Sequence, residues 1–163
     1  MTTAPATKVH DFDFLVGTWR ITSRRLNELL VGSDDWDEFP ATAVGQRFFD
    51  GAGSFDTVEF PTKGWKGMTL RLFDPEREEW TIYWANSRTG LLQPPVVGRF
   101  ADGRGEFYGD DTHDGTPEGR PIRARYIWTV IDDRSARWEQ AFSVDGERTW
   151  ETNWIMDLER ADR

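Results

Sequence analysis

Cysteine is absent from the 163 residues of this sequence, and histidine occurs only twice. Without cysteine the chain has no disulfide framework, no thiolate metal site and no cysteine nucleophile, and its composition fits a reducing compartment. A chain of this length can still bury roughly 70% of its unfolded surface. We therefore expect a single domain over residues 1–163, with a flexible tail over 1–9, that is stabilised by its core alone.

Long apolar segments and excess positive charge are also lacking. The opening residues MTTAPATKVHDF have no apolar core of signal-peptide length, and no apolar run approaches the length of a membrane span. Lys and Arg number 20 against 29 Asp and Glu, for a net charge of −9, which opposes binding to phosphate backbones. These features predict a cytoplasmic protein that binds neither nucleic acid nor membrane.

The signatures of several enzyme classes are missing. Gly51-Ala52-Gly53 and Gly103-Arg104-Gly105 are hairpin glycines with no helix after them, so a nucleotide cofactor is not indicated. Ser135 and Ser143 have no G-x-S-x-G context and no histidine near them in the sequence, which argues against a hydrolase triad.

The two histidines suggest no metal site or haem site. His10 precedes the first structured segment and is expected at the surface. His113 has Asp110, Asp111 and Asp114 nearby, but loops of this composition are commonly solvated turns. We predict no metal and no cofactor.

Aromatic residues are abundant, with 9 tryptophans, and the closing hairpin shows how they are arranged. Residues 135–158 alternate apolar and other side chains with a period of two, on either side of an Asp145-Gly146 turn. The face that we predict to be buried carries Ala136, Trp138, Gln140, Phe142, Trp150, Thr152, Trp154, Met156 and Leu158. The opposite face carries Glu139, Glu151, Asn153 and Asp157, with Ile155 as the exception. An isolated hairpin cannot bury such a surface, so other strands must curve round it.

The rest of the chain predicts a run of further strands and almost no helix. One helical turn is expected around Phe12, Leu15 and Val16, ended by Gly17. The strands are expected at 19–28, 42–49, 54–60, 66–73, 79–88, a hairpin over 96–111, residues 120–132, and the closing hairpin. Residues 29–40 are expected to form a loop, in which Trp36 caps the barrel mouth or, slightly favoured, is a core ring.

About ten strands joined by short Asp-Gly turns predict an all-β fold. Short connections allow only antiparallel neighbours, and ten strands exceed what one open sheet holds without curling. We predict a single up-and-down antiparallel β-barrel, with a two-sheet sandwich as the alternative. A barrel of this size can enclose one small ligand.

The entry to the first strand, Gly17-Thr18-Trp19, resembles the G-x-W signature of lipocalins and the wider calycin superfamily. The segments DFDFLVGTWR, EWTIYWA, GRFADGRGEFYG and RWEQAFSVDGERTWETNW resemble a bacterial family of uncharacterised calycin-like proteins. The resemblance implies a barrel whose Trp19 plugs the closed end beneath an arginine from a late strand, Arg160 or alternatively Arg148. The chain departs from lipocalins in lacking a secretory signal, a disulfide and a final helix, and from the haem-binding nitrobindins in lacking a late histidine.

Polar side chains on the predicted inner face are the main clue to a site. Each buried polar group needs a partner, which can be another side chain, water or a ligand. The alternative is an interior filled solid by tryptophans. The inner polar residues are predicted to be Arg25, Gln46, Asn86, Tyr126, Gln140 and Thr152. Arg25 faces inward unless a bulge near Ser23 returns it to solvent and turns Leu26 in.

Three functions are compatible with such a barrel. The first is binding of a small apolar or aromatic molecule, stacked on Trp84, Trp128, Trp138 and Trp154 and oriented by Gln140, Tyr126 and Arg25. The second is a cofactor-free enzyme such as a cyclase, hydratase or decarboxylase. In it Tyr126 and Arg25 polarise a carbonyl, and Glu139 or Asp157 acts as a base if the register slips by one residue. The third is a homodimerisation module that uses Ile127 and Ile155 on the outer faces.

Overall fold

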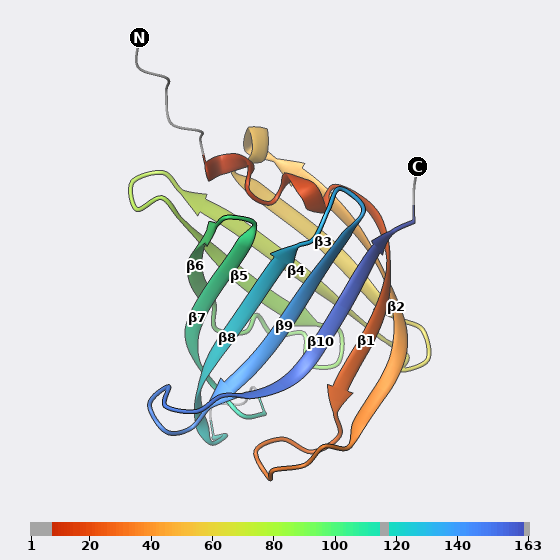
Figure 1. The fold of residues 1–163 in the computed structure, drawn as a ribbon, viewed down its shortest axis with the longest axis vertical. Helices are drawn as coiled ribbons and strands as arrows, with labels where there is room; N and C mark the ends of the chain where they lie inside the picture. The colour runs from red at the N-terminus through yellow and green to blue at the C-terminus, as the bar shows by residue number, and fades with distance from the viewer. Residues whose placement is uncertain (1–7, 115–117, 162–163) are drawn as a thin grey trace.

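A computed structural model describes residues 8–114 and 118–161 of the chain, and within this part ten antiparallel strands form a closed barrel (Figure 1). Strands that are consecutive in the chain are neighbours in the barrel, and β1 pairs with β10 to close it. The strands are β1 (Gly17–Leu26), β2 (Trp36–Phe48), β3 (Gly53–Phe60), β4 (Trp65–Asp74), β5 (Glu79–Asn86), β6 (Val96–Ala101), β7 (Arg104–Thr112), β8 (Pro121–Val130), β9 (Ser135–Ser143) and β10 (Glu151–Arg160). The predicted up-and-down barrel is confirmed, and the sandwich alternative is wrong.

Glycines after aspartates make the short turns, as the sequence predicts. Gly51, Gly103 and Gly146 have φ values of 109°, 76° and 72°, a left-handed backbone that glycine adopts without strain. Gly115, which follows Asp114 in another Asp-Gly dipeptide of the sequence, lies outside the described residues. The turn that follows β4 is held differently, because the Asp74 carboxylate accepts hydrogen bonds from the backbone N–H groups of Glu76 and Arg77.

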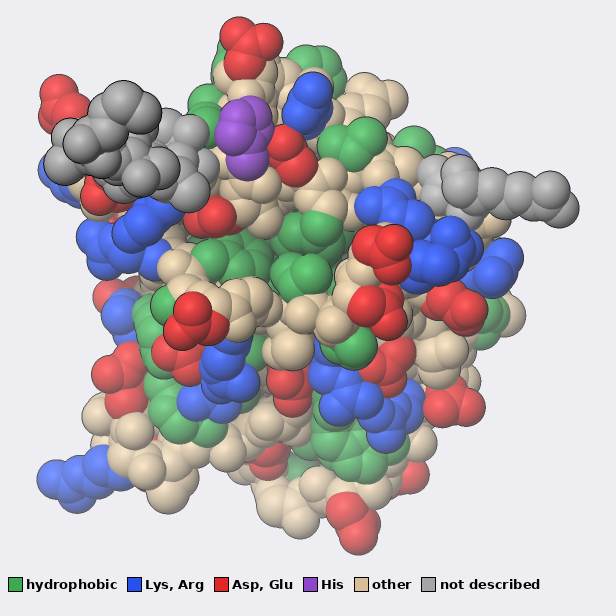
Figure 2. All heavy atoms as spheres, turned by 45° about the horizontal axis from the view of Figure 1, so that its top comes forward, with side chains coloured by type: hydrophobic (Ala, Val, Ile, Leu, Met, Phe, Trp, Pro, Cys, Tyr) green, Lys and Arg blue, Asp and Glu red, His purple; other side chains and the backbone are tan. Residues whose placement is uncertain are grey.

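Two short helical turns close one end of the barrel. These are η1 (Lys8–His10) and η2 (Asp13–Leu15), which lie at the top of Figure 1. Phe12 and Leu15 are buried in the core, so the predicted N-terminal turn is confirmed. Of the predicted flexible tail, residues 1–7 lie outside the described part, whereas Lys8 and Val9 belong to η1. Figure 2 brings this end forward and shows acidic and basic side chains interspersed around apolar ones.

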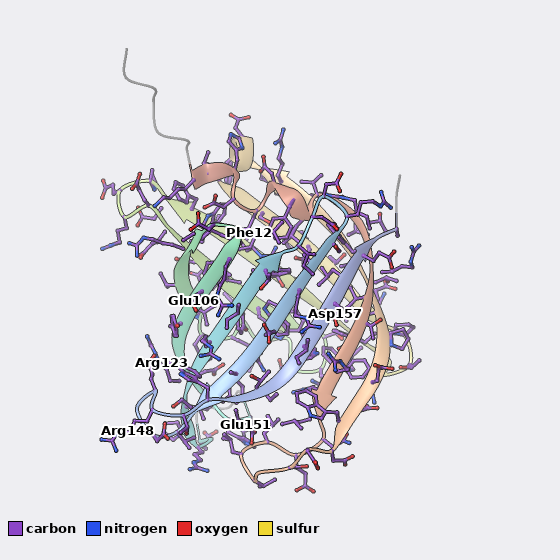
Figure 3. The ribbon with its side chains drawn as sticks, in the orientation of Figure 1. Phe12, Glu106, Arg123, Arg148, Glu151 and Asp157 are labelled. Carbon is purple, nitrogen blue, oxygen red and sulfur yellow. The ribbon has the colours of Figure 1, made fainter. Side chains whose placement is uncertain are left out.

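Trp19 and Arg160 fix the closed end to the seam of the barrel. The Trp19 indole N–H donates to the Leu15 carbonyl at 3.1 Å, and the Arg160 guanidinium lies 4.5 Å from the centre of the Trp19 ring. Arg160 also donates to the carbonyls of Val16 at 2.6 Å and Phe14 at 2.7 Å. Arg160, and not Arg148, is therefore the arginine over the tryptophan. Figure 3 places Arg148 on the β9–β10 loop, at the opposite end from Phe12.

A β-bulge in β10 changes which side chains face inward. Thr152 pairs with Ala141 and Trp154 with Gln140, so Asn153 is an extra residue between them. Asn153 is fully buried, whereas Trp150 lies on the outer face against Tyr108. The predictions that Trp150 and Thr152 face the interior and that Asn153 faces out are therefore wrong, because strict alternation fails at the bulge.

Strand β4 places its polar side chains inside the barrel. Thr69 and Arg71 are buried, whereas Met68 and Leu70 on the other face are 47% and 36% exposed. Gly67 belongs to the buried face, and a side chain there would meet the Trp84 ring, since an added Cβ would lie 2.1 Å from it. β4 therefore directs Met68 and Leu70 outward and Arg71 inward, although Trp65 of the same strand also faces the interior, and this places charge inside the barrel.

Trp36 does not belong to the core. It begins β2, opposite Leu26, and it is exposed. The favoured interpretation of Trp36 as a core ring is therefore wrong, and the predicted loop over 29–40 ends five residues early. Within the described residues, no helix has the length and apolar character needed to cross a membrane.

Candidate functional site

The barrel interior contains a cavity, which we call the inner cavity. It begins under the closed end at Leu15 and Trp19 and extends down to Trp84 and Trp154. The space in which the centre of a water molecule can lie is about 60 Å³. One water needs about 10–15 Å³ on this measure, so the inner cavity can hold a few waters or one small ring. The interior is thus not filled solid, and it is far smaller than the pockets of drug-sized ligands.

Six of the residues predicted to form a ligand site line the inner cavity. They come from β5, β8, β9 and β10, and cross-strand pairing brings several of them side by side, as for Trp128 opposite Trp138 and Tyr126 opposite Gln140. The rings meet edge to face, as aromatic pairs prefer, with the centres of Trp138 and Trp154 5.4 Å apart. The six are Trp84, Tyr126, Trp128, Trp138, Gln140 and Trp154.

Three other predicted site residues lie elsewhere. Gln46 is exposed on the outer face of β2, because the inward positions of that strand are the odd ones. The Asn86 amide oxygen accepts hydrogen bonds from the backbone N–H groups of Arg88 and Thr89, so this side chain holds a turn. Thr152 lies outside because of the bulge.

Arg25 faces inward without a bulge at Ser23. The β1–β2 and β1–β10 registers run unbroken through Ser23, whose side chain is fully buried. Arg25 is opposite Trp154 and lies 4.7 Å from the centre of its ring. It lines a second space nearer the open end and not the inner cavity, so it does not join Tyr126.

The groups predicted as bases and as a dimer surface lie on the outer face, as the strand alternation predicts. Glu139 pairs with Ile127 and Ile155 on the outer face, so no register slip turns it inward. The Asp157 carboxylate is held outside by the Arg137 guanidinium, with a shortest distance of 2.7 Å. Ile127 is only 6% exposed, so it is too covered for the dimer surface predicted with Ile155.

A buried polar cluster on β3 and β4 was missed by the sequence prediction. Arg71 is 2% exposed and donates to the Asp56 carboxylate at 2.6 Å and to the Ser54 hydroxyl at 3.2 Å. Arg71, Asp56 and Thr69 all line the inner cavity. The Arg71 Nε–H is buried and has no hydrogen-bond partner among the described residues. An orphan donor of this kind in a native fold needs a partner that the chain does not supply.

One feature of the sequence could have predicted this cluster. Ser54, Asp56, Val58 and Phe60 share a face of β3, so that face combines a carboxylate with core side chains. A buried carboxylate requires a cation on a neighbouring strand, and Arg71 is the cation that β4 supplies. Taken alone, the alternation of Met68, Leu70 and Leu72 would have predicted that their face of β4 is buried and that Arg71 is exposed.

Two further polar groups complete the lining of the inner cavity. The Gln140 amide donates to the Asn153 side-chain oxygen at 2.9 Å, so the bulge residue holds Gln140 in place. Burial raises the pKa of the Tyr126 phenol, with the Asp111 charge adding to the effect. Tyr126 therefore keeps its proton at neutral pH and can act as a donor but not as a base.

A triangle of tryptophans separates the inner cavity from the open end. We call Trp65, Trp84 and Trp154 the tryptophan layer: their ring centres are 6.5 Å apart for Trp65 and Trp84, 6.2 Å for Trp65 and Trp154, and 6.1 Å for Trp84 and Trp154. Beyond it lies a larger polar space of about 600 Å³ on the same measure, which we call the vestibule. Its lining includes Arg25, Lys63, Trp65 and Arg88.

The two histidines lie at opposite ends of the molecule. His10 contacts the Asp13 carboxylate at 2.8 Å at the closed end, whereas His113 lines the vestibule. In the described part of the chain, no three His, Asp or Glu side chains are grouped so that they could hold a metal ion.

Comparison with known proteins gives only a distant structural likeness. No family model matches the chain, and no curated protein matches its sequence. Among solved structures, a redesigned β-barrel matches with 9% sequence identity and a TM-score of 0.39, over 98% of this chain and 100% of the other.

Proposed function

We propose that this protein is a calycin-like barrel that binds a small aromatic or apolar molecule in its inner cavity. The calycin assignment is supported by Gly17 and Trp19 at the start of β1 and by Arg160 stacked over that tryptophan. The binding function is supported by the five tryptophans that line an unfilled interior.

The observation that carries the proposal is the orphan donor of Arg71. The guanidinium is buried in an apolar cavity, and its Nε–H lacks a partner in the described part of the chain. A buried donor left unsatisfied costs about 1–3 kcal/mol, so a ligand that accepts this hydrogen bond recovers that cost. The ligand therefore carries an acceptor atom on a body the size of one ring.

The charge of the cluster selects a neutral acceptor. The Asp56 carboxylate lies 2.6 Å from the Arg71 guanidinium and already balances its charge. An anionic ligand would add an uncompensated buried charge, which is far more costly than a neutral carbonyl. We therefore infer a ketone, aldehyde, amide or phenol rather than a carboxylate.

Binding is favoured over the enzyme hypothesis because the groups named for catalysis are not in place. Glu139 and Asp157 face outward, and Tyr126 is separated from Arg25 by the tryptophan layer. The raised pKa of Tyr126 makes it a hydrogen-bond donor to the same ligand acceptor.

Two ligands of the same shape test the proposal. We expect acetophenone to shift the indole N–H resonances of Trp128 and Trp154 in a saturable way, with a Kd of about 0.1–10 mM, as befits a ligand of this size. Isopropylbenzene, which lacks the acceptor, should bind about tenfold more weakly. Equal binding of the two would contradict the role of Arg71, and absence of saturable shifts with either would contradict the binding function.

A conservative variant provides the matched control. Arg71→Lys keeps a positive charge beside Asp56 and removes the Nε donor, so it should reduce acetophenone binding to the level of isopropylbenzene. Isopropylbenzene binding should be unchanged in the same variant. Because the two-ligand comparison in the unaltered protein needs no substitution, the proposal remains testable if Arg71→Lys does not fold.

A further inference from the structure

The vestibule at the open end has a chemistry that the inner cavity does not share. It is about ten times larger, with about 600 Å³ against about 60 Å³, and much of its lining is charged. Its walls come from the ends of β1, β2 and β4 and from the loops that follow β1, β3, β5 and β7. The tryptophan layer separates it from the site proposed above, and the inference that follows does not depend on that site.

Two arginines of the vestibule lie over rings of the tryptophan layer. The Arg25 guanidinium is 4.7 Å from the ring centre of Trp154, and the Arg88 guanidinium is 4.1 Å from that of Trp65. Both arginines line the vestibule, and the charge of Arg88 is close enough to lower the pKa of Arg25. A cation–π contact uses the positive charge of a guanidinium and does not itself consume its N–H donors, which can still bind an oxyanion.

Neither arginine is neutralised by the part of the chain that the structure describes. No carboxylate there forms an ion pair with Arg25 or Arg88, and neither guanidinium donates a hydrogen bond there. The third cation of the vestibule, Lys63, is paired with Asp37. Among the described residues, Arg25 and Arg88 thus keep a positive charge that no carboxylate balances, although the whole chain has a net charge of −9.

The pKa of Arg25 also indicates that the charges of the two arginines are not balanced. Arg25 is half-buried, and burial together with the charge of Arg88 lowers its pKa. Like charges held together cost free energy, and an anion placed between them recovers it.

We propose that the vestibule binds an organic carboxylate, with its oxygens held between Arg25 and Arg88. A carboxylate matches the fork of a guanidinium in shape, and a single negative charge suits a space that also contains Glu28 and Asp114. The apolar part of the ligand lies against Leu26, Leu29 and Phe39, which line the same space. The ligand is therefore an amphipathic monoanion.

Three small molecules distinguish a carboxylate site from an apolar groove and from a phosphate site. Titrations are followed by calorimetry and by the indole N–H resonances of Trp65 and Trp154, in the full chain at low ionic strength. We expect hexanoate to bind at least tenfold more tightly than hexanamide or inorganic phosphate, and to weaken when salt is added. Equal binding of hexanamide would mean an apolar groove without an anion site, and tighter binding of phosphate would overturn the carboxylate assignment.

Matched variants of three vestibule cations locate the site. Arg25→Gln and Arg88→Gln should each reduce hexanoate affinity at least tenfold, whereas Lys63→Gln, whose charge Asp37 already balances, should change it less than twofold. A similar loss in all three variants would indicate general attraction of anions and overturn the proposal. Acetophenone should not displace hexanoate, so failure of either site is detected independently of the other.

Discussion

Both ends of this barrel stack arginine on tryptophan, yet the two ends use the contact differently. At the closed end Arg160 lies over Trp19 and donates to three backbone carbonyls, those of Phe14, Val16 and Asp133. At the open end Arg25 and Arg88 lie over Trp154 and Trp65 at similar distances, and no described residue accepts from either guanidinium. The same geometry thus completes the structure at one end and leaves donors unused at the other.

The difference shows that a stacked arginine is not by itself evidence of a binding site. Hydrogen bonds to charged donors contribute about 1.5–3 kcal/mol, whereas an exposed cation–π contact contributes about 0.5–1 kcal/mol. The stability contributed by each arginine is therefore set by what its N–H groups bind, and that quantity can be measured at both ends.

The largest expected effect is the loss of Arg160. Arg160→Ala removes the hydrogen bonds to the carbonyls of Val16 and Phe14 and uncovers Trp19, which should lower the free energy of unfolding by about 2–4 kcal/mol. The matched variant Arg25→Ala should change it by about 1 kcal/mol or less. Urea denaturation measures both. Equal losses at the two ends would remove the distinction drawn between them.

The next effect concerns the packing of the tryptophan layer. Gly67→Ala places a Cβ 2.1 Å from the Trp84 ring and should cost about 1–3 kcal/mol through overpacking. The double variant Gly67→Ala, Trp84→Phe should recover part of this loss, because phenylalanine is smaller. Thermal or urea unfolding measures the stability of the single and the double variant. A Gly67→Ala variant as stable as the parent would show that the rings of the tryptophan layer shift to accommodate the added Cβ.

The smallest effect is a pH dependence at the open end. The side-chain hydroxyl and backbone N–H of Thr149 and the Ser143 hydroxyl donate to the Asp145 carboxylate, which lowers its pKa from 3.8 to about 2. Because the folded-state pKa is lowered, this stabilisation is complete above about pH 4 and is lost as the pH falls toward 2.

Asp145→Asn should therefore flatten the fall in unfolding free energy between pH 4 and pH 2. Thr149→Val, which removes one donor and keeps the carboxylate, should bring the Asp145 pKa back toward its ordinary value in an NMR titration. An unchanged titration curve in Thr149→Val would assign the stabilisation to the other donors of the turn.

The fold was predictable because its signals are local. Period-two alternation in β9 and Asp-Gly turns identify hairpins from neighbouring residues alone, and short connections then leave a barrel as the closed solution. The inward tryptophans of β5, β8 and β9 followed from the same alternation. The prediction failed where one added residue, Asn153, shifts the parity of β10 by one.

The site was less predictable because its key interaction joins two strands. Arg71 faces inward on account of Asp56 across the β3–β4 pair, although the alternation of Met68 and Leu70 in its own strand favours the opposite orientation. Single-strand periodicity contains no information about such a pair. In the same way Arg25 was placed correctly on the inner face, but its position beyond the tryptophan layer depends on rings from three strands.

The pairing of β1 with β10 sets the order in which the barrel can assemble. Every other strand pair joins neighbours in the chain and can form from a small loop, whereas this pair closes a loop of almost the whole chain. The hydrogen bond from the Trp154 indole to the Ser23 hydroxyl spans 131 residues across the same seam. The β1–β10 seam is therefore expected to form late in folding. Local opening of the closed barrel is expected to begin at the same seam.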